Sequence, residues 1–590
     1  MGSFVLAGLI VSGAWTQLDA IGPAVWLLPA LMLALDFTAP TLPGRLFQRP
    51  RFESTAAIIA AAALCTLHLL HVALTAREEF GFSGDEGYHL SATRAFALYF
   101  IKAGPYLAGA VAVFLLLRRF TPKIAASAAT VALIASSYFL PDAALFGRYP
   151  TGFYLLSTPL NVALDVAHVP FPFTANHIVN MLSLPAWLFV LRPAIIGRWP
   201  DWRVLPVALL MYFQGASITF TSSGLLEPWP FAILVLALEA VVAVEPDRRW
   251  IAVLLAGAAT CFKETAILFV PPIWMLAMID WRGWRPVLRP HAITIGVTAI
   301  VPFVVYFAVR RGLHIARGYD VAGSAALWTV ARARIWLANA RQLLGGGGSI
   351  SVGLVVTWLV AGLVVHRQAW RHYAVWMLAA IAIAIFFAAD VASIPFTGHG
   401  RFLAHSLLAL CGAVFATTYW LFTVNRRLLI GVSVAIAALQ VIPTARVFAL
   451  DFKPDYERNS LESYRSLIRF PVRSLIARLA DPAIARIRVL AFDMDLISLQ
   501  VAYPDLARRY ELRGESQSTA APDCGCHSPS EATLAVFEWP AHFDDTGDAR
   551  ESFESMHAAC VAQLRATCAT VALEQRPGGA IIGAIGAGRR

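Results

Sequence analysis

Long apolar runs that recur from the N-terminus to about Pro443 limit the possible folds of this chain more than any other feature. A helix needs about 20 mostly apolar residues to cross the hydrocarbon core of a bilayer, and the run from Thr55 to Ala76 contains no Asp, Glu, Lys or Arg. Only 14% of the 590 residues are charged, against about 25% in soluble domains. The sequence therefore predicts an α-helical polytopic membrane protein.

The apolar runs are numerous, and several of them are short for a complete crossing. We therefore expect roughly 13–15 transmembrane helices. The candidate spans lie near residues 4–19, 23–37, 55–76, 106–117, 123–140, 177–197, 204–221, 229–245, 250–262, 265–280, 291–309, 352–366, 373–389, 402–423 and 428–445.

Basic residues are concentrated in alternate connections between these runs. Because Lys and Arg are enriched in cytoplasmic loops, the alternation predicts which side faces the cytoplasm, and it accounts for the formal net charge of +10 without a nucleic-acid partner. Connections 77–103, 141–176, 221–228 and 390–401, and everything after Pro443, are then predicted to face outward from a plasma (inner) membrane. The cytoplasmic clusters are Arg45, Arg49 and Arg51; Arg118, Arg119 and Lys123; Arg198 and Arg203; Arg248 and Arg249; Arg282, Arg285 and Arg289; Arg367 and Arg371; and Arg426 and Arg427.

The first outward connection contains "FSGDEGYHL", which places the acidic pair Asp85 and Glu86 just beyond an apolar run and next to Tyr88 and His89. A glycine on each side of the pair permits tight backbone paths. A carboxylate held at the membrane surface can take a proton from an attacking hydroxyl or stabilise charge on a sugar. The alternative is a solvated loop without a catalytic role.

Three further connections carry ionisable residues that are candidates for the same face. Asp142 and Arg148 lie in the second outward connection, where Asp142 can also serve as a helix cap. Glu227 precedes a proline and is interpreted as the marker of a helix start. Lys263 and Glu264 interrupt an apolar hairpin; such residues indicate a functional site or pair with each other. Lys263 is a candidate phosphate contact.

The outward segment 310–348 breaks the charge pattern, because it carries many arginines against a single acid, Asp320. Arg334 and Arg341 are seven residues apart and would share a helix face. Attraction to membrane lipid headgroups is one explanation; forked guanidinium contacts to a phosphate-linked lipid are the other. Later, His399 and Arg401 stand where an apolar run begins, and a cation there can hold a phosphate leaving group.

The order of these motifs resembles the GT-C glycosyltransferase superfamily, in particular its dolichyl-phosphate-mannose protein mannosyltransferase and bacterial aminoarabinose-transferase-like branch. The resemblance covers about Thr55 to Pro443. It implies a polyprenyl-phosphate-sugar donor, used on the non-cytoplasmic side, and a lipid, glycan or protein acceptor. It also implies that Asp85 binds or deprotonates the acceptor beside Glu86, and that Arg401, in "HGRFL", lies near the donor phosphate.

The expected reaction is an inverting transfer that needs no metal and no cofactor. Lys263, Arg401 and the arginine-rich segment can neutralise the phosphate as it leaves, and the first loop contains no Asp-x-Asp motif. Two other classes remain open. A lipid-linked oligosaccharide polymerase or ligase would fit the 310–350 segment, whereas a flippase-type transporter would carry functional charges near mid-membrane and inverted repeats.

The tail after about residue 445 has a different composition, in which strand-like runs alternate with helical ones and predict a small extracytoplasmic α/β domain. Its cysteines, Cys524, Cys526, Cys560 and Cys568, are even in number on the oxidising side, which favours disulfides over a metal site and leaves three pairings open. The predicted domains are an extra N-terminal hairpin and linker (1–54), the GT-C-like region (55–445) and the tail (446–590).

Overall fold

A computed structural model of the chain gives the fold. It describes residues 50–75, 89, 92–93, 96–97, 112, 149–150, 152–167, 175–213, 226–280, 285–286, 292–312, 370–391, 400–435, 437–438, 486–492, 511–515, 524–526, 531–538, 547–576 and 579–586. The predicted spans 4–19, 23–37, 106–117, 123–140 and 352–366 lie outside these ranges, except for residue 112.

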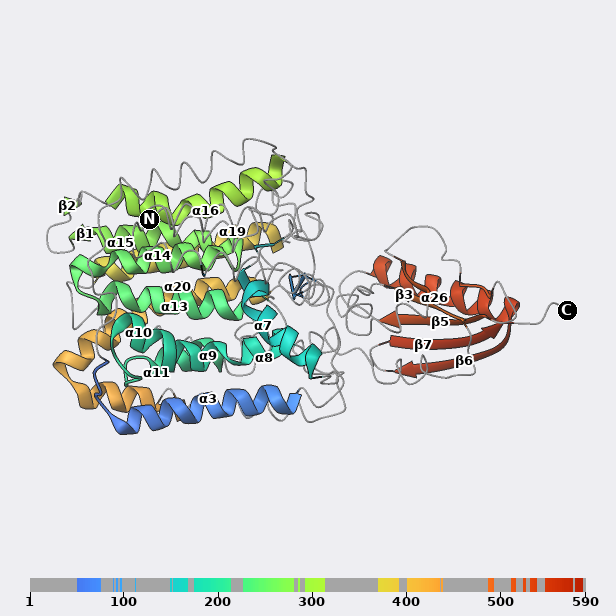
Figure 1. The fold of residues 1–590 in the computed structure, drawn as a ribbon, viewed down its shortest axis with the longest axis horizontal. Helices are drawn as coiled ribbons and strands as arrows, with labels where there is room; N and C mark the ends of the chain where they lie inside the picture. The colour runs from blue at the N-terminus through green and yellow to red at the C-terminus, as the bar shows by residue number, and fades with distance from the viewer. Residues whose placement is uncertain are drawn as a thin grey trace.

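Helices form most of the described part between residues 50 and 438, so the protein is mainly helical (Figure 1). The only strands described there are β1 (Ile279–Asp280) and β2 (Arg285–Pro286), which pair antiparallel. The helices are α3 (Thr55–Thr75), α7 (Gly152–Val166), α8 (Ala175–Met181), α9 (Ser183–Ala186), the π-helix η3 (Trp187–Leu191), α10 (Arg192–Ile196), α11 (Leu205–Tyr212), α13 (Pro228–Ala243), η4 (Pro246–Arg248), α14 (Trp250–Thr260), η5 (Glu264–Phe269), α15 (Val270–Met278), α16 (Ala292–Gly312), α19 (Trp370–Val391) and α20 (Gly400–Val424).

The apolar runs locate α3, α13, α14, α16, α19 and α20 to within a few residues at each end. Other described runs differ from the expected pattern, most clearly in two places. The run at 177–197 is not one straight helix, because the chain bends by 43° between α8 and the segment that begins at Ser183. Connection 141–176 contains the helix α7, which was not predicted and which includes Pro159 in its interior.

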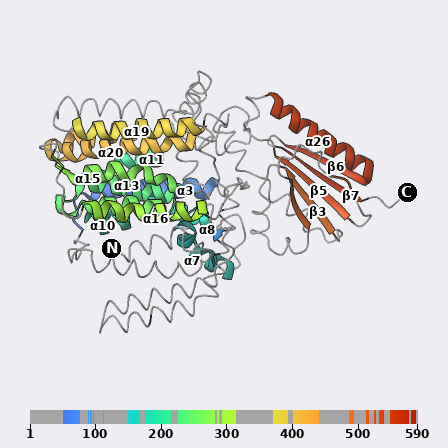
Figure 2. The same ribbon diagram turned by 90° about the horizontal axis from the view of Figure 1, so that it is seen from above.

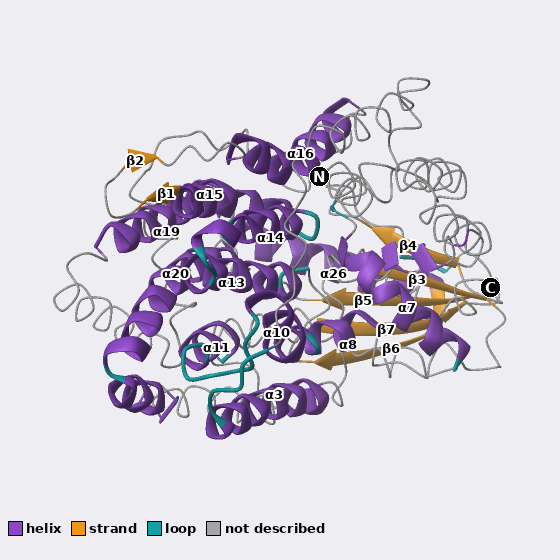
Figure 3. Cartoon of the chain, turned by 60° about the vertical axis from the view of Figure 1, so that its left-hand side comes forward, coloured by secondary structure: helices purple, strands orange, loops and turns teal. Residues whose placement is uncertain are grey.

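Helix α13 forms the centre of the bundle. Nearly every residue from Pro228 to Val241 is buried, and Figure 3 shows α13 among α10, α14 and α20. A helix that is apolar on all sides is stable only when other helices enclose it. Glu239 is the one acidic residue in this helix, and it is fully buried.

Small residues let the neighbouring helices approach closely. A Cβ at Gly257 of α14 would lie 2.7 Å from the backbone oxygen of Ala299 in α16. A Cβ at Gly412 of α20 would collide with the indole of Trp376 in α19, which is fully buried. Any side chain larger than hydrogen at these two positions would force the helix pairs apart.

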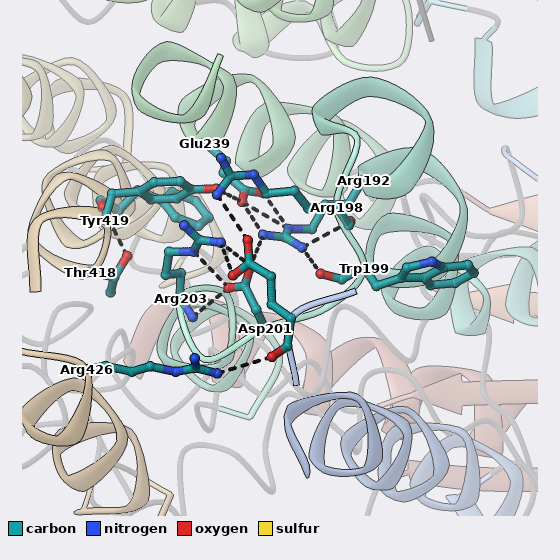
Figure 4. Close-up of polar contacts among 11 residues, drawn as sticks. Arg192, Arg198, Trp199, Asp201, Arg203, Glu239, Thr418, Tyr419 and Arg426 are labelled. Carbon is teal, nitrogen blue, oxygen red and sulfur yellow. Dashed lines mark hydrogen bonds and ion pairs between the residues drawn. The ribbon is translucent and has the colours of Figure 1, made fainter. Parts of the chain in front are cut away.

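Glu239 belongs to a buried charge network, which we call the Arg192 network (Figure 4). Arg192 Nε donates to Glu239 Oε1 (2.9 Å), and Arg192 Nη2 donates to Asp201 Oδ2 (2.8 Å). Arg203 Nη2 donates to Asp201 Oδ2 and to Glu53 Oε2, both at 2.7 Å. Arg192, Asp201 and Glu239 have no exposed side-chain surface, so each charge depends on the others for compensation.

Aromatic rings and backbone groups complete this network. The Tyr419 hydroxyl donates to Glu239 Oε1, and the guanidinium of Arg203 lies over the rings of Tyr419 (4.5 Å) and Phe422 (4.0 Å). Arg426 donates to the backbone oxygen of Glu53 (3.2 Å). The network therefore joins α10, the 198–203 connection, α13, α20 and the segment before α3 at one end of the bundle.

Burial raises the pKa of the Asp201 carboxyl, but Arg192 and Arg203 outweigh this effect and hold that pKa well below its usual range. Asp201 lies in the connection between α10 and α11, and its carboxylate also accepts the backbone N–H of Arg203 (2.9 Å). Asp201 is therefore a permanent anion at neutral pH, and it fixes this connection in place.

The tail contains a five-stranded sheet and one long helix, as the strand-like and helical runs predicted. The strand order is β4-β3-β5-β7-β6; β3 is parallel to β4 and β5, whereas β7 is antiparallel to β5 and β6. Figure 2 shows α26 along one face of this sheet. The elements are β3 (Arg486–Phe492), β4 (Glu511–Glu515), β5 (Glu531–Glu538), α26 (Gly547–Thr567), β6 (Cys568–Arg576) and β7 (Gly579–Gly586).

Both pairs of tail cysteines form disulfides, which confirms that prediction and selects one of the three pairings. Cys524 bonds to Cys560 in α26, and Cys526 bonds to Cys568 at the start of β6. The short Cys524–Cys526 segment is thereby tied to both the helix and the sheet.

Within the described ranges, one helical stretch, His405–Val424, is both long and apolar enough to cross a membrane. The bent pair formed by Ala175–Met181 and Ser183–Ile196 adds a second if it counts as one span. Shorter apolar helices lie at Thr55–Leu70, Gly152–Leu164, Pro228–Ala243, Glu264–Met278 and His372–Ile383.

Candidate functional site

Three residues of the predicted site, His89, Lys263 and Glu264, are described with their side chains. Arg401 lies in the first turn of α20, four positions before His405. The other predicted site residues are outside the described ranges: Asp85, Glu86, Tyr88, Asp142, Arg148, Arg334, Arg341 and His399.

Lys263 is the last of three residues between α14 and η5; its backbone is extended and its side chain is buried. Its ammonium lies 3.6 Å from Glu227 Oε1 and 4.8 Å from the centre of the Tyr149 ring. Glu227 is also buried, with 1% of its surface exposed. The ion pair that the structure describes for Lys263 is thus with Glu227 and not with its neighbour Glu264.

Glu227 does precede a helix, since α13 begins at Pro228, but its side chain forms no capping hydrogen bond. The carboxylate turns instead to Lys263. Two charges removed from water are stable only when they are compensated by each other and by further contacts. The face of Tyr149 supplies such a contact, because the ring quadrupole attracts a cation.

Tyr149, which lies under the Lys263 ammonium, also contacts His89, a buried residue of the first connection predicted to face outward. The rings of His89 and Tyr149 pack edge to face, with centroids 5.2 Å apart. His89 Nδ1 and the Tyr154 hydroxyl share a hydrogen bond of 2.7 Å. His89 is 2% exposed, and the rings of Tyr149 and Tyr154 pack against it.

Backbone and indole contacts fix the same segments to one another. The N–H of Gly152, at the start of α7, donates to the backbone oxygen of Cys261 at the end of α14 (3.0 Å). Trp229 Nε1 donates to the backbone oxygen of Val179 in α8 (3.1 Å). Together with the ion pair between Lys263 and Glu227, these bonds place the start of α7, the start of α13 and the end of α14 in one region, which we call the Lys263 end.

The first turns of α20 reach the Lys263 end through His405. Thr265 Oγ1, two residues after Lys263, lies 3.0 Å from His405 Nε2. His405 is buried between the rings of Phe231 and Phe269. Because residues four apart lie one above the other on a helix, position 401 is one turn from this contact.

Glu264 lies in the first turn of η5 and is half-buried. Its Oε2 atom is buried, and the structure gives it no hydrogen-bond partner. Within the described part of the chain, Glu264 therefore offers an unused polar atom at the residue that follows Lys263.

The Lys263 end and the Arg192 network lie near opposite ends of α13. Glu227 immediately precedes this helix, whereas Glu239 is in its last turns, and twelve residues of α-helix span about 18 Å. Residues 89, 149, 227 and 263 belong to connections that are predicted to face outward, and these connections meet at one end. Basic residues predicted to be cytoplasmic, Arg198, Arg203 and Arg426, meet at the other.

The arrangement at the Lys263 end combines a cation, two carboxylates and an imidazole among aromatic rings. Within the ranges that the structure describes, no three His, Cys, Asp or Glu side chains are grouped as metal ligands would be. A fixed ammonium of this kind suits an anionic oxygen of a ligand, and phosphate oxygens are the common case.

Sequence reasoning identified Lys263 and Glu264 as an anomaly in an apolar hairpin, and it missed the roles of Tyr149, Tyr154 and Glu227. A usable signal existed for Glu227. It is the single ionisable residue of its short connection, and a second ionisable residue, Lys263, stands at a connection predicted on the same side.

No model of a known protein family matches this chain, and no curated protein matches its sequence.

Proposed function

We propose that this protein is a multi-pass membrane glycosyltransferase that moves a sugar from a polyprenyl-phosphate donor to an acceptor hydroxyl at the non-cytoplasmic face. The observation that carries the proposal is the position of Lys263. This buried cation, held by Glu227 and Tyr149, lies where connections predicted to face outward come together. The phosphate of a lipid-linked donor lies at the membrane surface, because its polyprenyl chain stays in the bilayer, and Lys263 is proposed to lie at that surface.

Exposed apolar side chains on the outer helices support the membrane setting. Ile293 and Val297 of α16 are 66% and 53% exposed, and Leu378 of α19 is 66% exposed. Ile59 and Leu67 of α3 are exposed in the same way. Large apolar surfaces of this kind mark contact with a membrane or a partner and are rare on soluble monomers.

The separation of the two ends of the bundle supports the assignment of sides. The end with the excess of arginines is the one predicted to be cytoplasmic. The Lys263 end contains segments from four connections that are predicted to lie on the non-cytoplasmic side. A donor that is met at the Lys263 end is therefore met outside the cytoplasm.

The proposed reaction is a single displacement. The acceptor hydroxyl oxygen attacks the anomeric carbon, its proton passes to the Asp85 carboxylate, and the bond between that carbon and the phosphate oxygen breaks. The electron pair of that bond leaves with the lipid phosphate, whose charge Lys263 and Arg401 offset. One displacement inverts the anomeric carbon, and no electrons enter or leave the system.

The direct test uses the purified protein in liposomes with a labelled polyprenyl-phosphate hexose or pentose and a mixed set of lipid, glycan and peptide acceptors. We expect label to move to an acceptor, with release of polyprenyl phosphate. Movement of the intact donor across the bilayer without release would indicate a flippase instead. Transfer of preassembled oligosaccharides but not of single sugars would indicate a ligase or polymerase.

Replacing Lys263 with Met is expected to weaken donor binding by about tenfold or more, since a charge-assisted contact to phosphate is lost. The same change leaves Glu227 as a buried, uncompensated carboxylate and lowers stability. The measurements are donor affinity and thermal unfolding in the same detergent.

The double variant Lys263→Met, Glu227→Gln separates these two effects. Without either charge, stability should return towards that of the wild type, whereas donor binding should stay weak. Recovery of donor affinity in the double variant would show that Lys263 only neutralises Glu227, and it would remove the phosphate contact from the proposal.

The predicted sidedness can be measured independently of activity. A reporter fused after Pro443 is expected to score as extracytoplasmic, and a reporter inserted between Pro246 and Trp250 as cytoplasmic. The second position lies in η4, at the end of α13 that is far from Glu227. The opposite score at either position would place the Lys263 end on the wrong side for this reaction.

A further inference from the structure

Beside His89 lies a group of four buried, uncharged polar side chains that the reaction above does not use; three of them are joined by hydrogen bonds, and Asn161 lies one helical turn further along α7. We call it the amide cluster, and its members are Thr93, Ser157, Asn161 and Asn176. Thr93 Oγ1 lies 2.9 Å from Asn176 Oδ1 and 3.2 Å from Ser157 Oγ. Ser157 and Asn161 are four residues apart in α7 and so share one face of that helix.

Both amide side chains of this cluster have a polar atom that no hydrogen bond among the described residues uses. Asn161 Oδ1 and Asn176 Nδ2 are buried, and the structure gives neither atom a partner. The residues are 4% and 1% exposed. Since Asn176 is bonded through one end of its amide only, turning the group over would leave its other end unpaired. Buried polar atoms without partners cost stability, and such atoms call for an explanation.

The amide cluster is connected to Lys263 by a short series of contacts. Lys263 lies over Tyr149, Tyr149 packs on His89, and His89 bonds to Tyr154. Tyr154 precedes Ser157 by one turn of α7. A group bound at the amide cluster would therefore be separated from a phosphate bound at Lys263 by the side chains of Tyr149, His89 and Tyr154.

We propose that the amide cluster binds hydroxyl groups of the sugar carried by the donor. A sugar hydroxyl both donates and accepts, so it suits an unpaired amide oxygen together with an unpaired amide N–H. The cluster holds no charged side chain, which favours a neutral sugar. Tyr154, whose backbone oxygen accepts a hydrogen bond from Ser157 Oγ (3.3 Å), stacks with Phe96 next to the cluster, and aromatic side chains commonly pack on the C–H face of a pyranose. The inference rests on the proposed glycosyltransferase function and assigns the sugar end of its donor.

The test compares two lipids, a polyprenyl phosphate and the same polyprenyl phosphate carrying a neutral hexose. Wild-type protein is expected to bind the sugar-bearing lipid about tenfold more tightly, the effect of one or two well-formed hydrogen bonds. Asn161→Leu should abolish this difference and leave the affinity for the bare lipid unchanged. Its thermal stability without ligand should be equal to that of the wild type or higher, because an apolar group replaces an unpaired amide.

Thr158→Val is the matched control. Thr158 is buried on the same side of α7, but its hydroxyl already donates to the backbone oxygen of Tyr154 (2.7 Å), so the preference for the sugar-bearing lipid should persist. If Asn161→Leu keeps that preference, a structural water fills the cluster and the inference fails. A change confined to the acceptor KM would also overturn the assignment to the donor. If neither lipid binds the wild type, the proposed function fails, and the inference fails with it.

Discussion

Replacing Arg192 with Met is expected to lower the free energy of unfolding by about 3–5 kcal/mol, the usual effect of removing one partner from a buried ion pair. Arg192 compensates both Asp201 and Glu239, and none of the three side chains is exposed. Met fills much of the space of the arginine stem, so the loss arises from two carboxylates left without their central cation. Chemical unfolding of the purified protein in mixed micelles measures the change.

Arg426→Met is the control at the same end of the bundle. Arg426 donates to a backbone oxygen and lies 5.1 Å from the Phe422 ring, at an exposed position, so its loss should cost about 0–1 kcal/mol. The combined change Arg192→Met, Asp201→Asn, Glu239→Gln should recover much of the stability, because no uncompensated charge remains. Equal losses for Arg192→Met and Arg426→Met would show that burial does not determine the effect.

The contribution of the Arg192 network depends on pH in a defined direction. The pKa of Asp201 is lower in the folded protein than its ordinary value of 3.8. The stabilisation is therefore fully present above that ordinary value and decreases as the pH falls below it towards the folded-state pKa.

Replacing Asp85 with Asn is expected to reduce sugar transfer by roughly a hundredfold or more, the usual contribution of a general base. The amide keeps the size of the side chain and much of its hydrogen bonding but cannot take the proton of the acceptor hydroxyl. Expression and membrane insertion should not change. Initial rates with saturating donor in reconstituted liposomes measure the effect.

Two neighbouring acids provide matched controls for Asp85. Glu86→Gln should reduce transfer less than Asp85→Asn, because the role expected for Glu86 is orientation. Glu78→Gln, in the same connection, should have almost no effect on the rate. Transfer by Asp85→Asn within a few-fold of the wild type would end the assignment of this base and direct attention to Glu86 and Asp142.

The positions of the main helices could be predicted because their apolar runs are long and uniform. Helix α13 is an example, since a run that is apolar on all sides can only be a core helix or a span. Helix α7 could not be predicted in this way. Ser157, Pro159 and Asn161 interrupt its apolar pattern. Ser157 and Asn161 are buried, at positions where a sequence pattern predicts apolar residues.

The Arg192 network shows a second limit of sequence reasoning. The sequence pattern indicates only a membrane orientation for Arg198 and Arg203, yet Arg203 is nearly buried and bonds to Asp201 and Glu53. Glu239 and Tyr419 complete the network from two helices far apart in the sequence. Charge patterns give the side of the membrane, but helix packing decides which charges meet.

The candidate site could be predicted in part, for a similar reason. Lys263 is conspicuous as an ionisable residue between apolar segments. Its partner Glu227 belongs to a different connection and stands beside a proline, where a local role is the ordinary expectation. The contact between them depends on the packing of α13 against α14, which no local pattern encodes.

The two disulfides of the tail determine what happens when the backbone between their cysteines is cut. Cys524 and Cys526 are neighbours, whereas their partners Cys560 and Cys568 lie beyond the next strand and along or after α26. A backbone cut anywhere between Cys526 and Cys568 therefore leaves both fragments covalently joined. A protease that cuts this interval therefore opens the chain without releasing a fragment, and separating the two fragments then requires a reductant.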